Sequence, residues 1–131
     1  MNLLAIDYGT KKSGIATGTA WFAFAWWTVP TSKLVSTVQK IIPEKRIEKI
    51  IIGMPYNIDG SMSEHGRRVQ KFWDRLSEEI GLPFEYSDER LSTSEARIGF
   101  LEAHVDGDID AESARLILEH YYEGISTAVE W

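Results

Sequence analysis

The segment KIIIGMP at residues 49–55 constrains the fold more than any other part of the chain, because its apolar run shows no alternation. A strand with one face in solvent alternates apolar and polar residues, whereas a strand covered on both faces does not. The run therefore predicts a strand at the centre of a sheet that has helices on both faces. This arrangement is typical of α/β proteins.

Three segments before this strand also predict strands, at residues 2–7, 13–18 and 21–28. They are rich in apolar, β-branched or aromatic side chains, and the connections between them are short. Short connections favour antiparallel pairing between successive strands. The first part of the chain is therefore expected to form three antiparallel strands.

The third of these segments contains the aromatic run WFAFAWW. Strand alternation predicts one set of side chains buried under helices, with Ala23 and Ala25 making room on the opposite face. The residues expected to be buried are Phe22, Phe24 and Trp26. The alternative is that Trp21, Trp26 or Trp27 stacks on nucleic-acid bases.

After residue 30 the pattern alternates between helix and strand. The first expected helix begins at Thr31-Ser32 and ends at Pro43, and the central strand follows it. A helix over 64–80 and a strand over 82–86 come next. Two more helices are expected, one from the capping box of Ser92 and Glu95 through Leu101 and one over 110–122. Three antiparallel strands followed by this alternation predict an α/β fold with a mixed five-stranded sheet flanked by helices. A length of 131 residues suits one domain over residues 1–131.

The net charge of −6 is unevenly distributed, with +2 in residues 1–66 and −8 in residues 67–131. Acidity argues against a nucleic-acid partner, because phosphate binding relies on Lys and Arg. A bound divalent cation would neutralise part of the acidic region, whereas the alternative is a solvated helix face. The chain has no cysteine, no apolar run long enough to span a bilayer and no signal-peptide pattern, so we expect a cytoplasmic protein without a membrane partner.

Four carboxylates are candidates for one site: Asp7, Asp88, Glu89 and Asp110. In mixed α/β sheets, sites form at the carboxyl ends of the central strands. Asp7 ends the first strand and Asp88-Glu89 follow a later parallel strand, so they are expected at one edge if those strands are neighbours. Asp110 opens the last helix and would close the group, although an Asp in a first turn also serves as a helix cap.

Carboxylates that converge in this way repel one another unless a cation lies between them. Oxygen ligands without nearby His or Cys suit Mg²⁺ or Mn²⁺ rather than Zn²⁺. Such a site polarises a phosphoryl oxygen and activates water, as in two-metal nucleases. Arg90 would either contact the phosphate or hold one carboxylate in place. The three histidines show no ligand spacing.

Exposed cations offer candidate contacts to a nucleic-acid backbone. Lys11 and Lys12 lie beside the Asp7 turn, and Arg67, Arg68, Lys71 and Arg75 recur at near-helical spacing in the helix over 64–80. Ordinary loop lysines and a solvated helix face are the alternatives.

Four blocks of the chain closely resemble, in order, the YqgF/RuvX family of Holliday junction resolvase-like proteins, also described as pre-16S ribosomal RNA nucleases. The blocks are AIDYGTKKSGIA, IIIGMPYNIDGSMSEHGRRVQKF, DERLSTSEA and IDAESARLILEHYY. The chain departs from the family pattern at Met54, at Ser113, and in the segment HVDGD, where the family is commonly rich in Lys and Arg. Loss of those charges should weaken phosphate binding.

The resemblance implies a ribonuclease H-like fold and a divalent-metal nuclease, hence a hydrolase. Matched motif by motif, it implies that Asp7, Glu89 and Asp110 are catalytic and that they bind Mg²⁺ or Mn²⁺ together with Asp88. It also implies a bacterial cytoplasmic protein that matures the 5′ end of ribosomal RNA, with branched DNA as the other substrate. Cutting a Holliday junction would call for a homodimer with two symmetric sites.

Two rival functions remain open on the sequence. DYGTKKSGIATG is also similar to the first phosphate-binding hairpin of the actin, Hsp70 and sugar-kinase superfamily. Those proteins bind ATP between two such domains, and the length supplies one. The second rival is an RNA- or protein-binding module that keeps the fold without catalysis, which the loss of the basic segment favours.

Overall fold

Five strands form one mixed sheet in the order β3-β2-β1-β4-β5 in the computed structural model, which describes residues 1–19, 22–88 and 109–129. The strands are β1 (Leu3–Asp7), β2 (Lys12–Thr19), β3 (Phe22–Pro30), β4 (Lys49–Met54) and β5 (Phe84–Asp88). β1, β2 and β3 are antiparallel neighbours, whereas β4 is parallel to both β1 and β5. The predicted mixed five-stranded sheet is confirmed.

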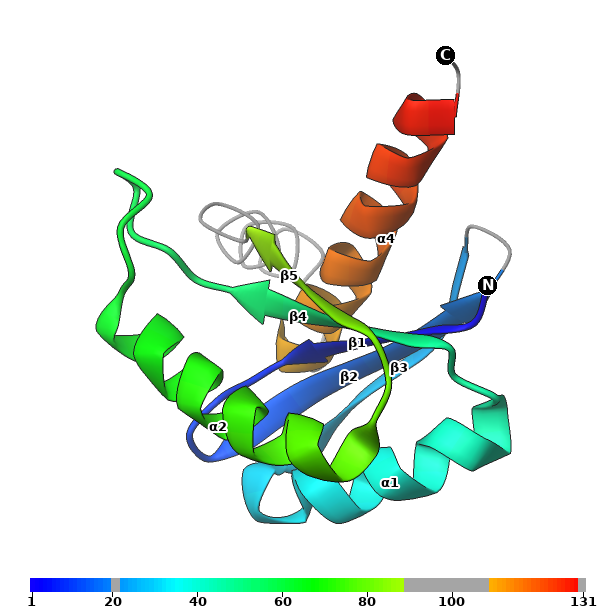
Figure 1. Ribbon diagram of the computed structural model, residues 1–131, viewed down its shortest axis with the longest axis horizontal. Helices are drawn as coiled ribbons and strands as arrows, with labels where there is room; N and C mark the ends of the chain where they lie inside the picture. The colour runs from blue at the N-terminus through cyan, green and yellow to red at the C-terminus, as the bar shows by residue number, and fades with distance from the viewer. Residues whose placement is uncertain (20–21, 89–108, 130–131) are drawn as a thin grey trace.

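Helices cover both faces of this sheet (Figure 1). A 3-10 turn, η1 (Thr31–Lys33), leads into α1 (Leu34–Lys45), and α2 (Glu64–Ile80) follows β4. Both pack on one face, where their side chains share a core with β1 and β4. The last helix, α4 (Ile109–Val129), packs on the other face. No helix in the described ranges is both long enough and apolar enough to cross a membrane.

The position of β4 explains its unbroken apolar sequence. Ile50 and Ile52 belong to the core under α1 and α2, whereas Ile51 between them belongs to the core under α4. All three are almost completely buried. The prediction of a central strand covered on both faces is therefore confirmed.

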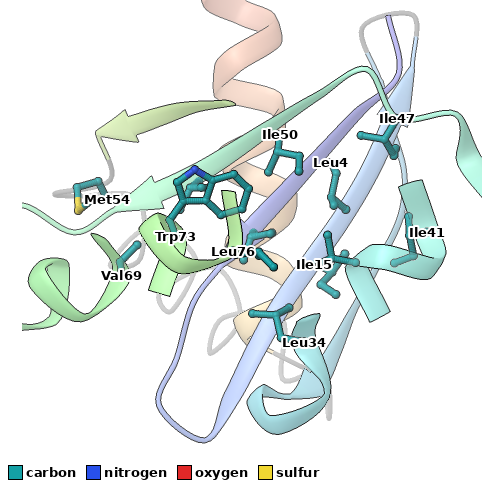
Figure 2. Packing of buried hydrophobic residues seen from close by; sticks show 13 residues of the cluster. Leu4, Ile15, Leu34, Ile41, Ile47, Ile50, Met54, Val69, Trp73 and Leu76 are labelled. Atoms are coloured by element: carbon teal, nitrogen blue, oxygen red, sulfur yellow. The ribbon is translucent and has the colours of Figure 1, made fainter. Parts of the chain in front are cut away.

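Amphipathic spacing likewise explains α2. Val69, Trp73 and Leu76 lie on one side of the helix and are buried against the sheet (Figure 2). Ser63 caps the helix by accepting a hydrogen bond from the Gly66 amide at 2.8 Å. Gly81 ends the helix in the left-handed conformation, with φ at 57°, which glycine adopts without a steric penalty.

The prediction that Phe24 and Trp26 are buried is wrong. Phe24 is 68% exposed and Trp26 is 42% exposed. The pairing of β2 with β3 steps from Thr17 opposite Ala25 to Gly18 opposite Ala23, which leaves Phe24 without a partner. Such a bulge interrupts the alternation on which the prediction depended. The side chain of Phe22 lies outside the described residues.

Several element boundaries also differ from the predicted ones. α1 continues through Pro43 to Lys45, because a proline in the last turn removes only one helical hydrogen bond. β5 begins and ends two residues later than predicted, and α4 is longer at its carboxyl end. The helix predicted from Ser92 to Leu101 lies outside the described residues.

Candidate nuclease site

The parallel strands β1, β4 and β5 all end at one side of the sheet, called here the carboxyl edge. Asp7 is the last residue of β1 and Asp88 is the last residue of β5. The register places Ile6 opposite Ile52 and Met54 opposite Asp88, so both acids lie at nearly the same level. Because β4 separates them by two strand spacings, their Cα atoms are about 10 Å apart.

Contacts at the far end of α4 fix its direction relative to β1. The Tyr122 hydroxyl donates to the Met1 carbonyl at 3.5 Å, and the Lys49 ammonium at the start of β4 donates to the Tyr121 hydroxyl at 2.9 Å. The carboxyl half of α4 therefore lies where β1 and β4 begin, which is called here the amino edge.

The first turn of α4 consequently lies at the carboxyl edge. From Asp110 to Tyr122 the helix rises about 18 Å, which is close to the length of an extended segment from Met1 to Asp7, about 20 Å. Figure 1 shows this turn near the arrowhead of β1. Three elements far apart in sequence, β1, β5 and α4, thus bring residues 7, 88 and 110 to one edge of the sheet.

The side-chain geometry of the predicted metal site is described only in part. Glu89, Arg90 and the side chain of Asp110 lie outside the described residues. Among the side chains that the structure does describe, no group of three or more His, Cys, Asp and Glu is close enough to hold a metal ion. The ligand set and catalytic roles of Asp7, Asp88, Glu89 and Asp110 therefore remain predictions.

The turn after Asp7 is held by a compact hydrogen-bond network. The Gly9 amide donates to Ser13 Oγ at 3.2 Å, and the Thr31 hydroxyl donates to the Gly9 carbonyl at 2.7 Å. Ser13 Oγ and Thr31 Oγ1 are themselves 2.8 Å apart. A Cβ atom on Gly9 would lie 2.1 Å from the Lys12 carbonyl oxygen, so the close approach of these two backbone segments requires glycine here.

His65 is a residue at this edge that the sequence did not single out. Its Nε2 atom lies 2.8 Å from the carbonyl oxygen of Tyr8, the residue after Asp7. Because a carbonyl only accepts, Nε2 must carry the proton and donate. The Tyr8 ring also packs against Phe72 of α2, with centroids 4.6 Å apart. These contacts tie the start of α2 to the Asp7 turn.

The start of α2 is also tied to the end of β4, because the Ser63 hydroxyl donates to the Pro55 carbonyl. This places the predicted cations Arg67 and Arg68, in the first turns of α2, near the carboxyl edge. Lys11 ends the turn between β1 and β2, and Lys12 begins β2, at the same edge. All four are exposed, and Arg68 pairs with Glu64 at 3.3 Å. Four of the five predicted substrate contacts therefore lie on segments at the carboxyl edge, and their role in binding a substrate remains a prediction.

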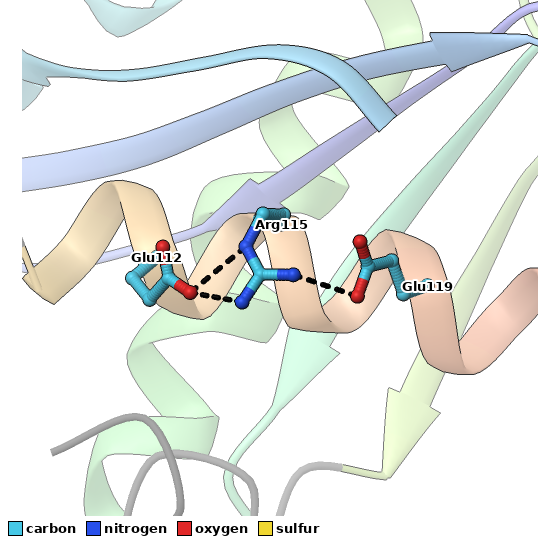
Figure 3. A network of polar contacts seen from close by, with 3 residues as sticks. All are labelled: Glu112, Arg115 and Glu119. Atoms are coloured by element: carbon cyan, nitrogen blue, oxygen red, sulfur yellow. Dashed lines mark hydrogen bonds and ion pairs between the residues drawn. The ribbon is translucent and has the colours of Figure 1, made fainter. Parts of the chain in front are cut away.

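Part of the acidity of α4 has a structural explanation. Arg115 forms ion pairs with Glu112 and Glu119 on the same helix (Figure 3). Its guanidinium also lies 5.5 Å from the ring centre of Trp26. The hydrogen bond with Glu112 is the main cause that raises the Arg115 pKa above its usual value. Both carboxylates are therefore engaged within the helix, and Arg115 offsets one of their two negative charges.

Comparisons with known proteins agree with this architecture. Thermus thermophilus RuvC in complex with a Holliday junction substrate superimposes with a TM-score of 0.64 at 12% identity, over 96% of this chain and 96% of RuvC. A protein of Escherichia coli O157:H7 named "Putative pre-16S rRNA nuclease" is 37% identical, over 92% of this chain and 95% of its own length. A protein of the same name from Trichormus variabilis is 33% identical, over 94% of this chain and 88% of its own length.

The sheet order, the helices on both faces and the likeness to RuvC define a ribonuclease H-like fold. The family model described as "RuvX: Holliday junction resolvase" matches residues 1–124. The chain belongs to the RuvX family.

Proposed function

We propose that the chain is a divalent-metal-dependent nuclease that hydrolyses phosphodiester bonds in the bacterial cytoplasm as a single domain over residues 1–131. The observation that supports this most is the convergence of β1, β5 and the first turn of α4, with Asp7, Asp88 and Asp110, at one sheet edge. Membership of a family of nucleases supports the reaction class.

The proposed metal ligands are Asp7, Asp88, Glu89 and Asp110, with Asp7, Glu89 and Asp110 as the catalytic residues. Their oxygen donors fit Mg²⁺ or Mn²⁺, because hard divalent cations prefer carboxylates. The chemistry supplied by such a cation, when bound, is polarisation of the phosphoryl group and activation of the attacking water. Asp7 is the last residue of β1, and the turn that follows it is held by hydrogen bonds of Gly9 with Ser13 and Thr31.

Cations around the site hold the substrate backbone in this proposal. Lys11, Lys12 and Arg67 are exposed at the carboxyl edge, and Arg68 is held only by a solvent-exposed pair with Glu64. Such pairs contribute about 0–1 kcal/mol, so a phosphate can replace Glu64 at little cost. Arg90 either contacts the phosphate or holds a carboxylate.

For the substrate we propose precursor 16S ribosomal RNA, processed at its 5′ end, because the curated relatives carry that name. Branched DNA is the second candidate, favoured by the likeness of the fold to RuvC. A junction has two strands to cut, so this second function would call for a homodimer with two sites related by symmetry.

Metal binding and cleavage test the proposal separately. Mn²⁺ should bind wild-type protein and raise its melting temperature, whereas Asp7→Asn and Asp110→Asn should weaken both effects and abolish cleavage. Asp74→Asn is the matched control, since Asp74 is an exposed acid in the middle of α2. It should behave like wild type.

The substrates for this assay are a structured RNA and a four-way DNA junction. Absence of Mn²⁺ binding would contradict the proposal. Metal-independent nucleic-acid binding without cleavage would identify a binding module, and tight metal-dependent ATP binding without cleavage would favour an actin-like ATPase. Glu89→Gln tests the acid whose position is not described and should also abolish cleavage.

A further inference from the structure

Three cations on α2 form a row that the proposed active site does not use in full. Arg67, Lys71 and Arg75 are spaced four residues apart, and all three are exposed. Residues at this spacing are neighbours on a helix surface, with Cβ atoms about 5–6 Å apart. Their side of α2 is opposite the side that buries Val69 and Trp73. The row therefore faces solvent along about 12 Å of helix.

Ion pairs hold Lys49, Arg68 and Arg115 in the described part of the chain, but not the three cations of the row. Lys49 pairs with Glu85, and Arg115 pairs with two glutamates on its own helix. By contrast, no described residue forms an ion pair with the side chains of Arg67, Lys71 or Arg75. The row is thus open to an external polyanion.

The row also has a defined beginning. The contacts of His65 with Tyr8 and of Ser63 with Pro55 attach the first turn of α2 to the carboxyl edge. Arg67 follows directly, so the row starts beside the proposed cleavage site. From there α2 runs back across the sheet towards the amino edge, where β5 begins (Figure 1).

The far end of the row is defined by a pocket. Successive residues at a spacing of four drift by about 40° around a helix, which turns Arg75 towards the groove between α2 and α1. Arg75 lines a pocket there together with Val35, Phe72, Leu76 and Glu79. Apolar walls beside a cation suit a nucleotide, which carries both a ring and a phosphate.

Charge distribution decides which face of the sheet a polyanion would follow. α4, on the opposite face, carries four acids against the single cation Arg115, a net charge of −3, whereas α2 carries four acids and four cations, a net charge of 0. A phosphate backbone is repelled from that face. The face of α2 is therefore the favourable exit path from the carboxyl edge.

We propose that Arg67, Lys71 and Arg75 form a phosphate-binding track for a single-stranded arm of the nucleic-acid substrate, leading from the cleavage site to the pocket beside Arg75. The spacing of the three cations is on the scale of the separation between successive phosphates of an extended strand. The track rests on the proposed nuclease function, because that function places the scissile bond where the row begins. It also supplies positive charge that the HVDGD segment lacks.

The test uses two double variants that remove the same charge. Lys71→Gln/Arg75→Gln removes two cations of the track, and Lys40→Gln/Lys45→Gln removes two exposed cations from α1 on the same face. The probes are a fluorescein-labelled RNA hairpin with a single-stranded uridine tail and the same hairpin with a blunt end. Fluorescence anisotropy in EDTA measures binding without cleavage, and circular dichroism checks folding.

Each phosphate contact on a single strand contributes about 0.7 to the slope of log K against log salt. The track variant should therefore lose about 1.4 of that slope for the tailed hairpin, which is about a 25-fold loss of affinity at roughly 0.1 M salt. Its affinity for the blunt hairpin should not change, and the α1 variant should bind both probes as wild type does.

Equal losses in the two double variants would overturn the track, because they would report net charge alone. An equal loss for tailed and blunt hairpins would overturn it as well, since the row would then contact the duplex. The assay contains no metal and measures binding alone, so the affinities for the two hairpins can be interpreted even if the nuclease proposal fails. Conversely, if the track variant binds the tailed hairpin as tightly as wild type does, the track is excluded even when the protein cleaves its substrate.

Discussion

Replacing Gly9 with alanine is expected to disturb the turn that follows Asp7 through a steric clash. The added Cβ atom would lie 2.1 Å from the Lys12 carbonyl oxygen, whereas Cβ atoms in proteins essentially never lie closer than 3.0 Å to another heavy atom. Gly9 does not have a positive φ angle. The backbone conformation of Gly9 would therefore tolerate alanine. The loss of stability comes instead from displacing the backbone at Lys12.

The magnitude follows from the hydrogen bonds that such a displacement breaks. The Gly9 amide donates to Ser13 Oγ at 3.2 Å, and the Gly9 carbonyl accepts from the Thr31 hydroxyl at 2.7 Å. Each bond contributes about 1 kcal/mol, and residual strain adds a similar amount. Gly9→Ala should lower the free energy of unfolding by about 2 to 4 kcal/mol.

Urea unfolding followed by circular dichroism measures this change, with Gly81→Ala as the matched control. Gly81 has φ of 57° but nothing within 4 Å of the position of a Cβ atom, so alanine there should cost only about 1 kcal/mol. In a Ser13→Ala background the effect of Gly9→Ala should shrink, because one of the broken bonds is already absent. A loss for Gly9→Ala no larger than that for Gly81→Ala would refute the steric argument.

Three further predictions concern other parts of the fold. Burial raises the pKa of Tyr122 to about 12, so the unfolded chain loses this proton near pH 10 and the native state only at higher pH. Stability should therefore fall as pH rises from 10 to 12, and urea unfolding should show a smaller decline in Tyr122→Phe than in wild type. His65→Ala removes the donor to the Tyr8 carbonyl and should lower the free energy of unfolding by about 1–2 kcal/mol in the same assay. His65→Gln should recover part of this loss, and equal losses in the two variants would exclude the hydrogen bond as the cause. Phe24→Ser should change the free energy of unfolding by no more than about 0.5 kcal/mol, because the Phe24 side chain is 68% exposed. A loss typical of a core residue would contradict the bulge.

Sequence patterns predicted those elements in which the order of apolar and polar residues follows from which faces are buried. The unbroken apolar run placed β4 at the sheet centre, and the spacing of Val69, Trp73 and Leu76 placed α2, because burial on one or both faces leaves a periodic trace. The bulge at Phe24 left no such trace. It depends on how β3 pairs with β2, which is a property of two strands and not of one.

In the candidate site, too, some residues were predictable from the sequence and others were not. Strand ends and parallel topology were sufficient to expect Asp7 and Asp88 at one edge, and the register bears out this placement. His65 could not be found from spacing, because it contacts a backbone carbonyl 57 residues away. Its ring and its partner are brought together only by the packing of α2 on the sheet.

The direction of α4 limits how this protein can change during evolution. Tyr121 and Tyr122 anchor the helix at one edge of the sheet, while Asp110 opens it at the other. A single residue inserted between these points would leave the anchor intact but turn Asp110 by about 100° and move it by about 1.5 Å. The number of residues in this interval should therefore tolerate neither insertions nor deletions, even where individual side chains vary freely.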